Sequence, residues 1–367
     1  MSSADTADRS PATHAERLSD APFVRFIGTP DGDALAAIGV LARTLDQPFQ
    51  ARLDRLATVS DDFDDVTVTV GTSGGDITLT DRPIASTALS IANELSNEPL
   101  GPAITTLGLA GVSASERAIE PTVERLETAF DRRPGIGVPT NGPIDGLAHS
   151  TLIHAPFSGD TEAVAELLGS VEDDLDDATR TTIASLVSMS VLENPETRAS
   201  HRIERLLHPL VAPAGPFATI AGYGDVLDGL ARVAPGDGLA LALGRSEPQE
   251  ALECWRAYAT TVHGAIDDCA LERHPGCVVA RLPAGSNAVL EPVARLIREF
   301  QSPEPVVLAV SGDSIVVTGT DGTAPAESLD HALESTTPAT PMTTTNGYTR
   351  VGVADPDPVV TAFTGAI

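Results

Sequence analysis

Short runs of strand-forming residues alternate with helical stripes near the start of the chain, and this alternation strongly constrains the fold. Residues 23–27, 49–53 and 66–70 have the composition of strands, and apolar residues over 33–45 recur with the period of a helix. Strands that alternate with helices form parallel sheets covered by helices on both faces. The sequence therefore predicts an α/β domain built on a parallel sheet.

The remaining sequence predicts a tail and two further regions. Residues 1–20 are rich in Ser, Ala, Asp and Thr, and we expect them to be a disordered tail. Residues 21–132 form the predicted α/β domain, and a Gly- and Pro-rich segment then begins a helical middle region over 133–214. Residues 215–367 are expected to form a smaller α/β domain, in which 238–244 has the pattern of a buried strand.

The charge balance is strongly acidic. The chain has 52 acidic and 23 basic residues, all 23 of them arginine, and a formal net charge of −29. Because the acids are spread along the chain, they predict a protein of a salt-accumulating halophile. The alternative is a protein that binds cationic ligands. In about 1 M salt the Debye length is about 3 Å, and counterion release drives nucleic-acid binding only weakly. The acidic charge therefore does not exclude a nucleic-acid partner.

The cysteines and the apolar runs predict a cytoplasmic location. Cys254, Cys269 and Cys277 lack the spacing of disulfide or metal motifs, which fits a reducing cytosol. The first 20 residues contain no apolar run of a signal peptide. The longest apolar stretch, 239–243, is too short to span a bilayer, so we expect no membrane partner.

Two carboxylates directly after the first predicted strand are the main candidate site. Asp31 and Asp33 lie where the carboxyl ends of parallel strands form a ligand crevice. Paired carboxylates there can hold Mg or Mn, and the alternative is that both acids cap the following helix. His149 and His154 are five residues apart, and they are predicted to make structural hydrogen bonds rather than to bind a metal.

Several segments resemble the motifs of the DHH phosphoesterase superfamily. The strand followed by Asp31, Gly and Asp33 resembles its first motif, and residues 77–83 resemble the strand and Asp-His-His signature of its third. Residues 105–112 resemble the helix of its fourth motif. The later run 221–232 resembles archaeal RecJ-like proteins, the GINS-associated nucleases.

The resemblance implies a DHH-type domain at 21–132 and a DHH-associated domain at 215–367. In this family two metal ions activate water and stabilise the phosphorus centre. Of the metal ligands that the resemblance implies, Asp31, Asp33 and Asp81 are present.

Other ligand positions of the family carry residues that do not bind metals. Thr29 takes the place of the first His, and the second-motif Asp falls within 71–73. Arg82 and Pro83 replace both histidines of the third motif, and the fourth-motif Asp falls within 113–115. Arg82 would place a fixed positive charge where a cation sits in the family. We therefore expect that catalysis has been lost and that no cofactor is needed.

The resemblance leads to three functional hypotheses. The first is an inactive RecJ-like protein that binds single-stranded DNA or RNA, or acts as a scaffold for replication or repair with GINS and the replicative helicase as partners. Eukaryotes use an inactive RecJ relative at the replication fork in this way. The alternative is an active Mn- or Mg-dependent exonuclease with a reduced site of Asp31, Asp33, Asp81 and an acid such as Asp76. The third is a subunit that binds only protein partners.

Three residues are candidates for contact with nucleic acid. Tyr348 begins a possible edge strand over 348–353 and would stack on a base, an interaction of about 1–3 kcal/mol. The alternative is an ordinary edge-strand tyrosine. Arg82 and Arg350 are the candidate cationic contacts.

Overall fold

The computed structural model describes residues 10–54, 65–126, 130–169, 175–192, 198–211, 215–320, 323, 325–334, 342–345 and 347–367. The chain packs as two compact units. The first consists of Met1–Arg133, Gly137–Asn141 and Pro209–Trp255, and the second of Pro134–Ile136, Gly142–His208 and Arg256–Ile367. No helix of the described residues has the length and apolarity needed to cross a membrane.

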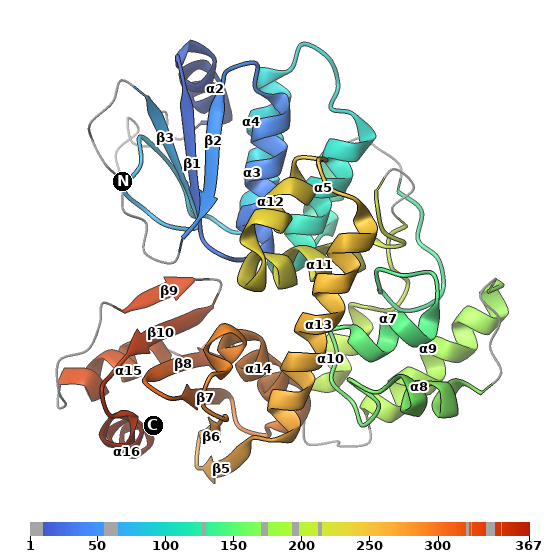
Figure 1. Ribbon diagram of the computed structural model, residues 1–367, viewed down its shortest axis with the longest axis vertical. Coiled ribbons are helices and arrows are strands. Elements are labelled where there is room, and N and C mark those ends of the chain that lie inside the picture. Colours follow the sequence, from blue (N-terminus) through green and yellow to red (C-terminus); the bar gives the residue numbers. More distant parts are fainter. Residues whose placement is uncertain are drawn as a thin grey trace. The chain divides into compact units, whose positions relative to one another are not determined.

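The first unit is built on a four-stranded parallel sheet in the order β2-β1-β3-β4 (Figure 1). Its strands are β1 (Val24–Gly28), β2 (Phe49–Leu53), β3 (Val66–Val70) and β4 (Ile77–Leu79). Its helices are α2 (Pro11–Asp20), α3 (Gly32–Thr44), α4 (Ile84–Leu95), α5 (Pro102–Ala114), α6 (Glu120–Arg125), α11 (Ile220–Val233) and α12 (Pro235–Ala242). Helix α13 (Pro248–Asp267) begins in this unit and ends in the second. The predicted parallel α/β architecture is confirmed.

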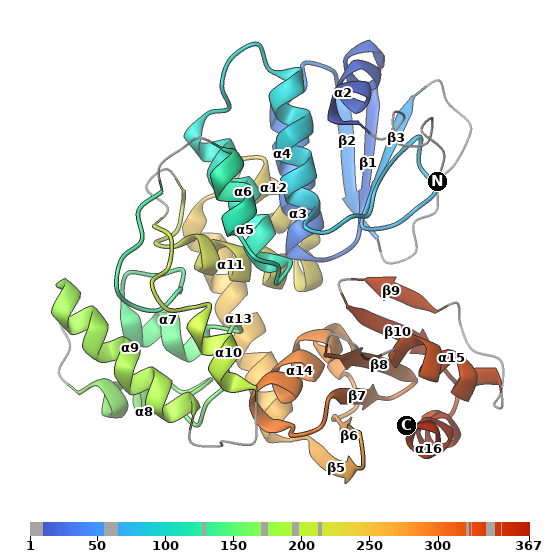
Figure 2. The ribbon, with the colours of Figure 1, turned by 180° about the vertical axis from the view of Figure 1, so that it is seen from behind.

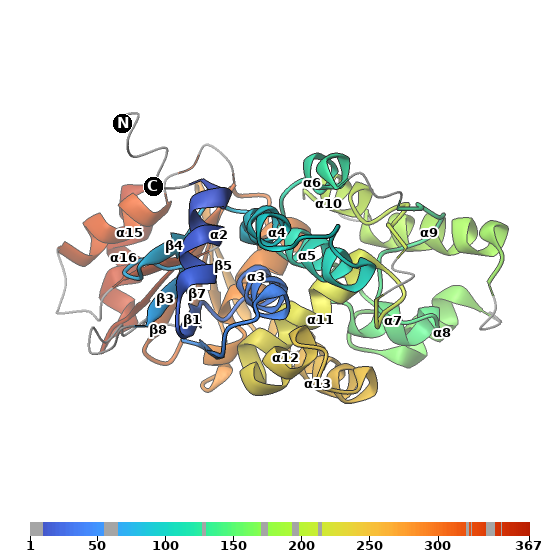
Figure 3. The ribbon, with the colours of Figure 1, turned by 90° about the horizontal axis from the view of Figure 1, so that it is seen from above.

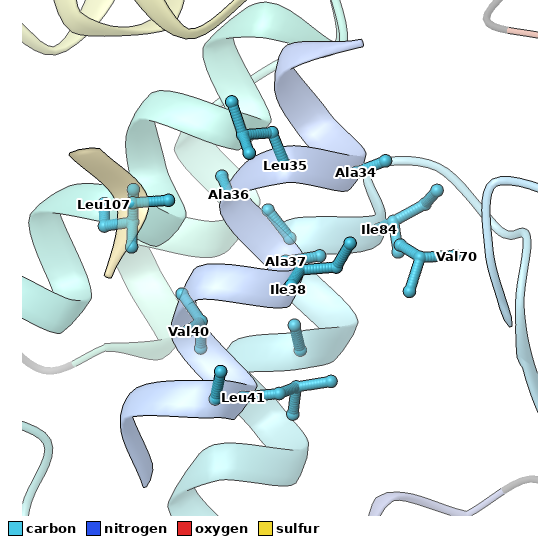
Figure 4. Packing of buried hydrophobic residues seen from close by; sticks show 14 of the residues in the cluster. Ala34, Leu35, Ala36, Ala37, Ile38, Val40, Leu41, Val70, Ile84 and Leu107 are labelled. Carbon is cyan, nitrogen blue, oxygen red and sulfur yellow. The ribbon is translucent and has the colours of Figure 1, made fainter. Parts of the chain in front are cut away.

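Helix α3 is the centre of this unit. Its residues from Gly32 to Ala42 are all buried, because it packs against β1, α4, α5 and α11 at once (Figure 3). A helix enclosed on all sides is apolar on all faces. Figure 4 shows Ala34, Ile38 and their neighbours with Val70 of β3 and Leu107 of α5. The small residues of α3 let several elements approach it closely, and its N-terminus is thereby fixed at the end of β1.

The predicted disordered tail is wrong for residues 10–20. Helix α2 covers Pro11–Asp20, and the Ser10 side chain caps it by accepting a hydrogen bond from the Thr13 N–H. His14, Ala15 and Leu18 form its buried stripe against α4. Ser at the cap and Pro at the first helical position are helix-start signals that composition alone did not reveal. Residues 1–9 of the predicted tail lie outside the described residues.

The predicted domain boundary at 215 differs from the packing. Helix α11 buries Val226, Leu227 and Leu230 in the core of the first unit, so residues up to 255 belong there. The strand predicted at 238–244 is also wrong, because helix α12 covers most of it. Alternating Leu and Ala fit a strand equally well, but the buried positions recur at helical spacing after a proline at the first position.

The second unit contains a six-stranded mixed sheet in the order β5-β6-β7-β8-β10-β9. Its strands are β5 (Ala270–His274), β6 (Cys277–Arg281), β7 (Val306–Ser311), β8 (Ser314–Gly319), β9 (Thr343–Thr345) and β10 (Tyr348–Gly352). Its helices, seen from the reverse side in Figure 2, are α7 (Pro143–His149), α8 (Thr161–Leu168), α9 (Asp177–Val191), α10 (Ala199–Glu204), α14 (Leu290–Leu296), α15 (Pro325–Glu334) and α16 (Pro356–Ala366), with a 3-10 turn η1 (Ser286–Ala288) and a π-helical turn η2 (Ile297–Gln301). The helical middle and the C-terminal sheet are thus parts of one packing unit.

Strand β10 is not the edge strand that the sequence suggested. It pairs with β8 on one side and with β9 on the other, so β9 takes the edge position. Much of the low-complexity segment before β9, including 335–341, lies outside the described residues, and its Thr-rich composition gave no strand signal.

Candidate functional site

Asp31 begins helix α3 at the carboxyl end of β1. Its Oδ1 accepts a hydrogen bond from the Ala34 N–H at 2.9 Å, so the side chain caps the helix. Its Oδ2 accepts a hydrogen bond of 2.6 Å from the Thr29 hydroxyl, the group at the position of the family's first histidine. Thr29 and Asp31 are 1% and 4% exposed. Asp31 therefore has the capping role that the sequence left as an alternative.

Asp33 lies two residues after Asp31, in the first turn of α3, and its side chain caps a different helix, α4. Its Oδ1 accepts from the Ala85 N–H at 2.8 Å, and its Oδ2 accepts from the Ile84 N–H at 2.9 Å. These two N–H groups belong to the first turn of α4, whose N-cap residue Pro83 supplies no side-chain hydrogen bond. Asp33 thus ties α4 to α3 from the buried side.

Arg82 connects both carboxylates. Its Nη1 and Nη2 donate to the two oxygens of Asp31 at 3.0 and 2.7 Å, and Nη1 also donates to Asp33 Oδ2 at 3.0 Å. The side chains of Arg82, Asp31 and Asp33 are 10%, 5% and 0% exposed. These three residues are called the acid–arginine cluster below. Arg82 lies between the acids, as its position in the third motif led us to expect.

Burial and charge act in opposite directions on the two acids. For Asp31, burial alone would raise the pKa, but the charge and hydrogen bonds of Arg82 outweigh it and hold the pKa below its ordinary value. For Asp33, burial dominates over Arg82, and the nearby Asp31 charge adds to it, raising the pKa to about 6. Burial disfavours the charged form of Arg82 as well, yet the two carboxylates raise its pKa. The cluster therefore keeps a permanent cation and one firmly ionised acid.

Packing also excludes a metal ligand at Gly71, which lies in the segment 71–73 where the second-motif Asp of the family falls. Gly71 follows β3 with φ +81°, and a Cβ atom there would collide with the Thr29 hydroxyl. An Asp at this position is therefore incompatible with the present placement of Thr29. Ser115, in the region of the fourth motif, is 2% exposed and donates to the Val112 carbonyl at the end of α5.

Neither of the other two candidate acids joins the cluster. Asp81 is exposed. Asp76 precedes β4, at the opposite end of the strands, where it accepts from the Thr67 N–H and lies 3.9 Å from Arg17. Within the described part of the chain, no group of three or more His, Cys, Asp or Glu side chains is arranged to hold a metal ion. Of the predicted metal set of Asp31, Asp33 and Asp81, the structure brings together only Asp31 and Asp33, which share Arg82.

The donor set that remains does not fit a two-metal centre. A pair of catalytic ions about 4 Å apart needs several carboxylate or imidazole ligands with free lone pairs. Here the acid pair already accepts hydrogen bonds from Arg82, Thr29 and backbone N–H groups. A cation at the acids would also have to displace a guanidinium that carries the same sign of charge.

Sequence reasoning missed a third carboxylate beside the cluster. Asp228 of α11 accepts a hydrogen bond of 3.1 Å from the Gly32 N–H in the first turn of α3. Arg232, one helical turn later, donates to both of its oxygens at 3.0 and 3.1 Å. The i,i+4 spacing of Asp228 and Arg232 predicts their pair, but only the fold brings it to α3. This acid is likewise neutralised by arginine.

Each of the three predicted nucleic-acid contacts is either buried or hydrogen-bonded within the protein. Tyr348 is 4% exposed, so its ring is not available for stacking on a base. Arg350 Nη1 donates to Glu291 at 2.9 Å and to the Asn287 carbonyl at 3.0 Å. Arg82 is engaged by the two acids. These placements contradict the proposed contact role of Tyr348 and give both arginines intramolecular partners.

The two histidines of the middle region make hydrogen bonds, as the sequence predicted. His149 Nδ1 lies 3.0 Å from the Asp145 carbonyl and 3.1 Å from its carboxylate. His154 lies against His263 and Gln301.

Comparison with solved structures identifies the class of fold. The chain superposes on CDC45 of Entamoeba histolytica with a TM-score of 0.56 and 8% identity, over 96% of both chains. It also superposes on exonuclease RecJ bound to manganese with a TM-score of 0.51 and 13% identity, over 97% of this chain and 92% of RecJ. The chain thus has the fold shared by CDC45 and RecJ, which is the fold that the sequence resemblance implied.

Sequence comparison places the chain more narrowly. Residues 269–365 match the family model for the C-terminal domain of uncharacterized protein rrnAC1427. Over 346 residues the chain is 38% identical to uncharacterized protein rrnAC1427 of Haloarcula marismortui, covering 90% of this chain and 89% of that protein. The chain belongs to the rrnAC1427 family.

Proposed function

We propose that this protein is a non-catalytic member of the RecJ-like class that serves as an assembly component in replication or repair. The observation that carries the proposal is the acid–arginine cluster. Arg82 donates to both Asp31 and Asp33 within 3.0 Å, at the strand ends where the family resemblance implies metal ions. A guanidinium supplies charge to the acids, but it cannot ionise water or bridge phosphate oxygens as a metal does.

The surrounding packing supports a structural role for the same residues. Asp31 caps α3 and Asp33 caps α4, and Arg82 compensates the two buried charges. The cluster thereby stabilises the central layer of the first unit without a metal ion. In this proposal, the protein retains the RecJ-like fold because its surfaces bind assembly partners, and not because it cleaves phosphodiesters.

The proposed partners follow from the resemblance to GINS-associated nucleases and from the fold shared with CDC45. They are GINS and the replicative helicase, with single-stranded DNA or RNA as a further proposed ligand. Because Tyr348 is buried, binding of a single strand would use other surfaces than the one expected from sequence.

A nuclease assay tests the loss of chemistry. Purified protein is incubated with end-labelled single-stranded DNA and RNA and with Mn²⁺ in molar KCl, beside an Asp33→Ala variant as a control for contaminating nuclease. We expect both samples to leave the strands intact. Trimming by the wild type that is lost in Asp33→Ala would show the rival function, an active exonuclease.

A second experiment tests the assembly role. The tagged protein is recovered from native high-salt lysate, with and without nuclease treatment, and co-purifying proteins are identified. We expect GINS or helicase subunits in both samples. Recovery only without nuclease would assign the association to nucleic acid, and absence of replication proteins from both would contradict the assembly role.

A further inference from the structure

Two buried histidines of the second unit face each other away from the candidate site. His154 lies between α7 and α8 and is 9% exposed, and His263 lies on α13 and is fully buried. Their Nδ1 atoms are 3.2 Å apart, the ring planes are inclined by 21° and the ring centroids are 5.4 Å apart. That centroid distance is close to the largest that the nitrogen separation allows. The two nitrogens therefore point at one another almost in line.

The outer nitrogens determine where the protons are. His263 Nε2 lies 3.1 Å from the Ser150 carbonyl, which only accepts, so this nitrogen carries the hydrogen. In the neutral ring, His263 Nδ1 then accepts, and His154 Nδ1 must donate to it. His154 Nε2 is left as an acceptor, 3.0 Å from the amide nitrogen of Gln301 in η2. All three hydrogen bonds are satisfied when both rings are neutral.

The geometry fits a hydrogen bond rather than a metal ion. Two imidazole nitrogens that face each other in line across Zn²⁺ would be about 4 Å apart, given bonds of about 2.0–2.1 Å. The observed 3.2 Å is instead a long N–H···N hydrogen bond.

The neighbouring charged groups oppose an additional proton. His149 at the end of α7 is paired with Asp145, which also accepts two hydrogen bonds from Arg256 of α13. Arg295 of α14 lies near His263 and donates to the Thr151 carbonyl at 2.8 Å. Burial lowers the pKa of His263 to about 3, with His154, His149 and Arg295 adding to the effect, and burial lowers the pKa of His154 to about 4.

We propose that the hydrogen-bond chain through Ser150, His263, His154 and Gln301 is an acid-sensitive latch. It holds the segment 150–159 and η2 to α13 while both rings are neutral, and it opens with the uptake of two protons. Gly159 approaches His263 closely, since an added Cβ there would lie 3.2 Å from the His263 Cβ, so this end of the segment packs directly against the histidine. This latch is independent of the acid–arginine cluster and of the proposed function.

The sign of the effect follows from linkage. Opened imidazoles have an ordinary pKa of about 6.5, whereas the closed rings stay neutral down to about pH 4. Between these limits the open state binds two more protons than the closed state. The opening equilibrium therefore rises as the pH falls below 6.5, approaching about 100-fold per pH unit.

Hydrogen exchange followed by mass spectrometry, on the full chain in molar KCl from pH 7.5 to 4.5, tests the latch. Protection factors corrected for intrinsic exchange should fall by up to about 100-fold per pH unit in peptides covering 150–159, 256–267 and 297–301. Helix α5 of the first unit, which contains no titratable side chain, is the internal reference and should fall much less. Protection in the three segments that does not depend on pH, or that falls equally in α5, would overturn the proposal.

A double variant, His154→Asn with His263→Gln, removes both titrating rings while keeping donors near Nδ1 of the first and Nε2 of the second. In this variant we expect the local pH dependence to disappear. The control His331→Gln changes a histidine whose side chain is 76% exposed and should behave as the wild type. An acid-dependent loss of protection that persists in the double variant would assign the effect to other groups. If the double variant does not fold, the wild-type exchange profile still decides the proposal.

Discussion

Arg82 lies between two carboxylates that burial makes costly to ionise, and each of the three groups depends on the others. Two acids and one guanidinium leave one excess negative charge in the cluster. Asp31 and Asp33 each lie at the N-terminus of a helix, where aligned peptide dipoles favour negative charge. The three groups therefore stabilise one another, and removal of any one of them leaves a buried charge without its partner.

Replacing Arg82→Met tests this dependence. The change leaves two buried acids without their cation, and we expect the free energy of unfolding at pH 7 to fall by about 3–5 kcal/mol. Denaturant unfolding in molar KCl measures it. The control is Arg52→Met, which removes a 3.8 Å pair whose side chains are 46% and 34% exposed and should cost at most about 1 kcal/mol. Equal effects of the two changes would contradict the buried-pair account.

Asp33→Asn tests the raised pKa of Asp33. Because the folded pKa is about 6, above the ordinary value of 3.8, the wild type gains stability from this group at low pH and loses it as the pH rises through 6. Asn cannot ionise, so the stability of the variant relative to the wild type should rise by up to about 3 kcal/mol between pH 4 and 7. Unfolding curves at several pH values measure the difference. A constant difference would show that Asp33 titrates normally.

At the same scale, the sequence predicted the position of Arg82 at the two acids but not the position of Asp81. Motif spacing after β4 places Arg82 at the acids, and the structure confirms that position. The adjacent Asp81 is exposed instead, since spacing along the chain does not say which way a turn residue points. The edge position expected for Tyr348 was wrong because the Thr-rich segment gave no strand signal for β9, which pairs with β10. The burial of the Tyr348 ring is a tertiary property that its neighbours in sequence do not reveal.

Close packing between helices in the first unit depends on a glycine at the start of α3. Gly32 in the first turn of α3 lies against α11, and a Cβ there would come within 2.9 Å of the Asp228 N atom and 2.8 Å of the Ala114 Cβ. A glycine is needed at this point because backbone atoms of α11 cannot move aside as a flexible side chain can.

Gly32→Ala should therefore push α11 from α3 and lower the free energy of unfolding by about 1–3 kcal/mol. The matched control is Gly236→Ala in the first turn of α12, where an added Cβ meets nothing within 4 Å. The control should be neutral or more stable by up to about 1 kcal/mol. Thermal or denaturant unfolding measures both, and a neutral Gly32→Ala would contradict the close packing of α3 and α11.

Most elements of the first unit were predictable because their apolar period and their end signals agree. Strands β1 to β3 and helices α3 and α4 follow this rule. Helices α2 and α12 are exceptions: α2 was hidden in a segment of tail-like composition, and the alternating Leu and Ala of α12 match both periods, so that only tertiary burial on one helical face decides.

Across the whole chain, the fold class was predictable and the division into units was not. The family motifs are local and survive in the sequence, whereas the packing of α11 into the first unit depends on long-range contacts, such as the hydrogen bond between Gly32 and Asp228, which are 196 positions apart. Similarly, α13 is one continuous helix, although its residues up to Trp255 belong to the first unit and those from Arg256 belong to the second.

If Arg82 takes the place of a metal ion at Asp31 and Asp33, the protein should bind no Mn²⁺ at these acids, and titration calorimetry in molar KCl measures this. Wild type, Asp33→Asn and Arg82→Ala are titrated under the same conditions. We expect no saturable heat from the wild type or from Asp33→Asn, and a binding signal only where removal of the guanidinium leaves the two carboxylates free. A stoichiometric Mn²⁺ site in the wild type that Asp33→Asn abolishes would contradict the account.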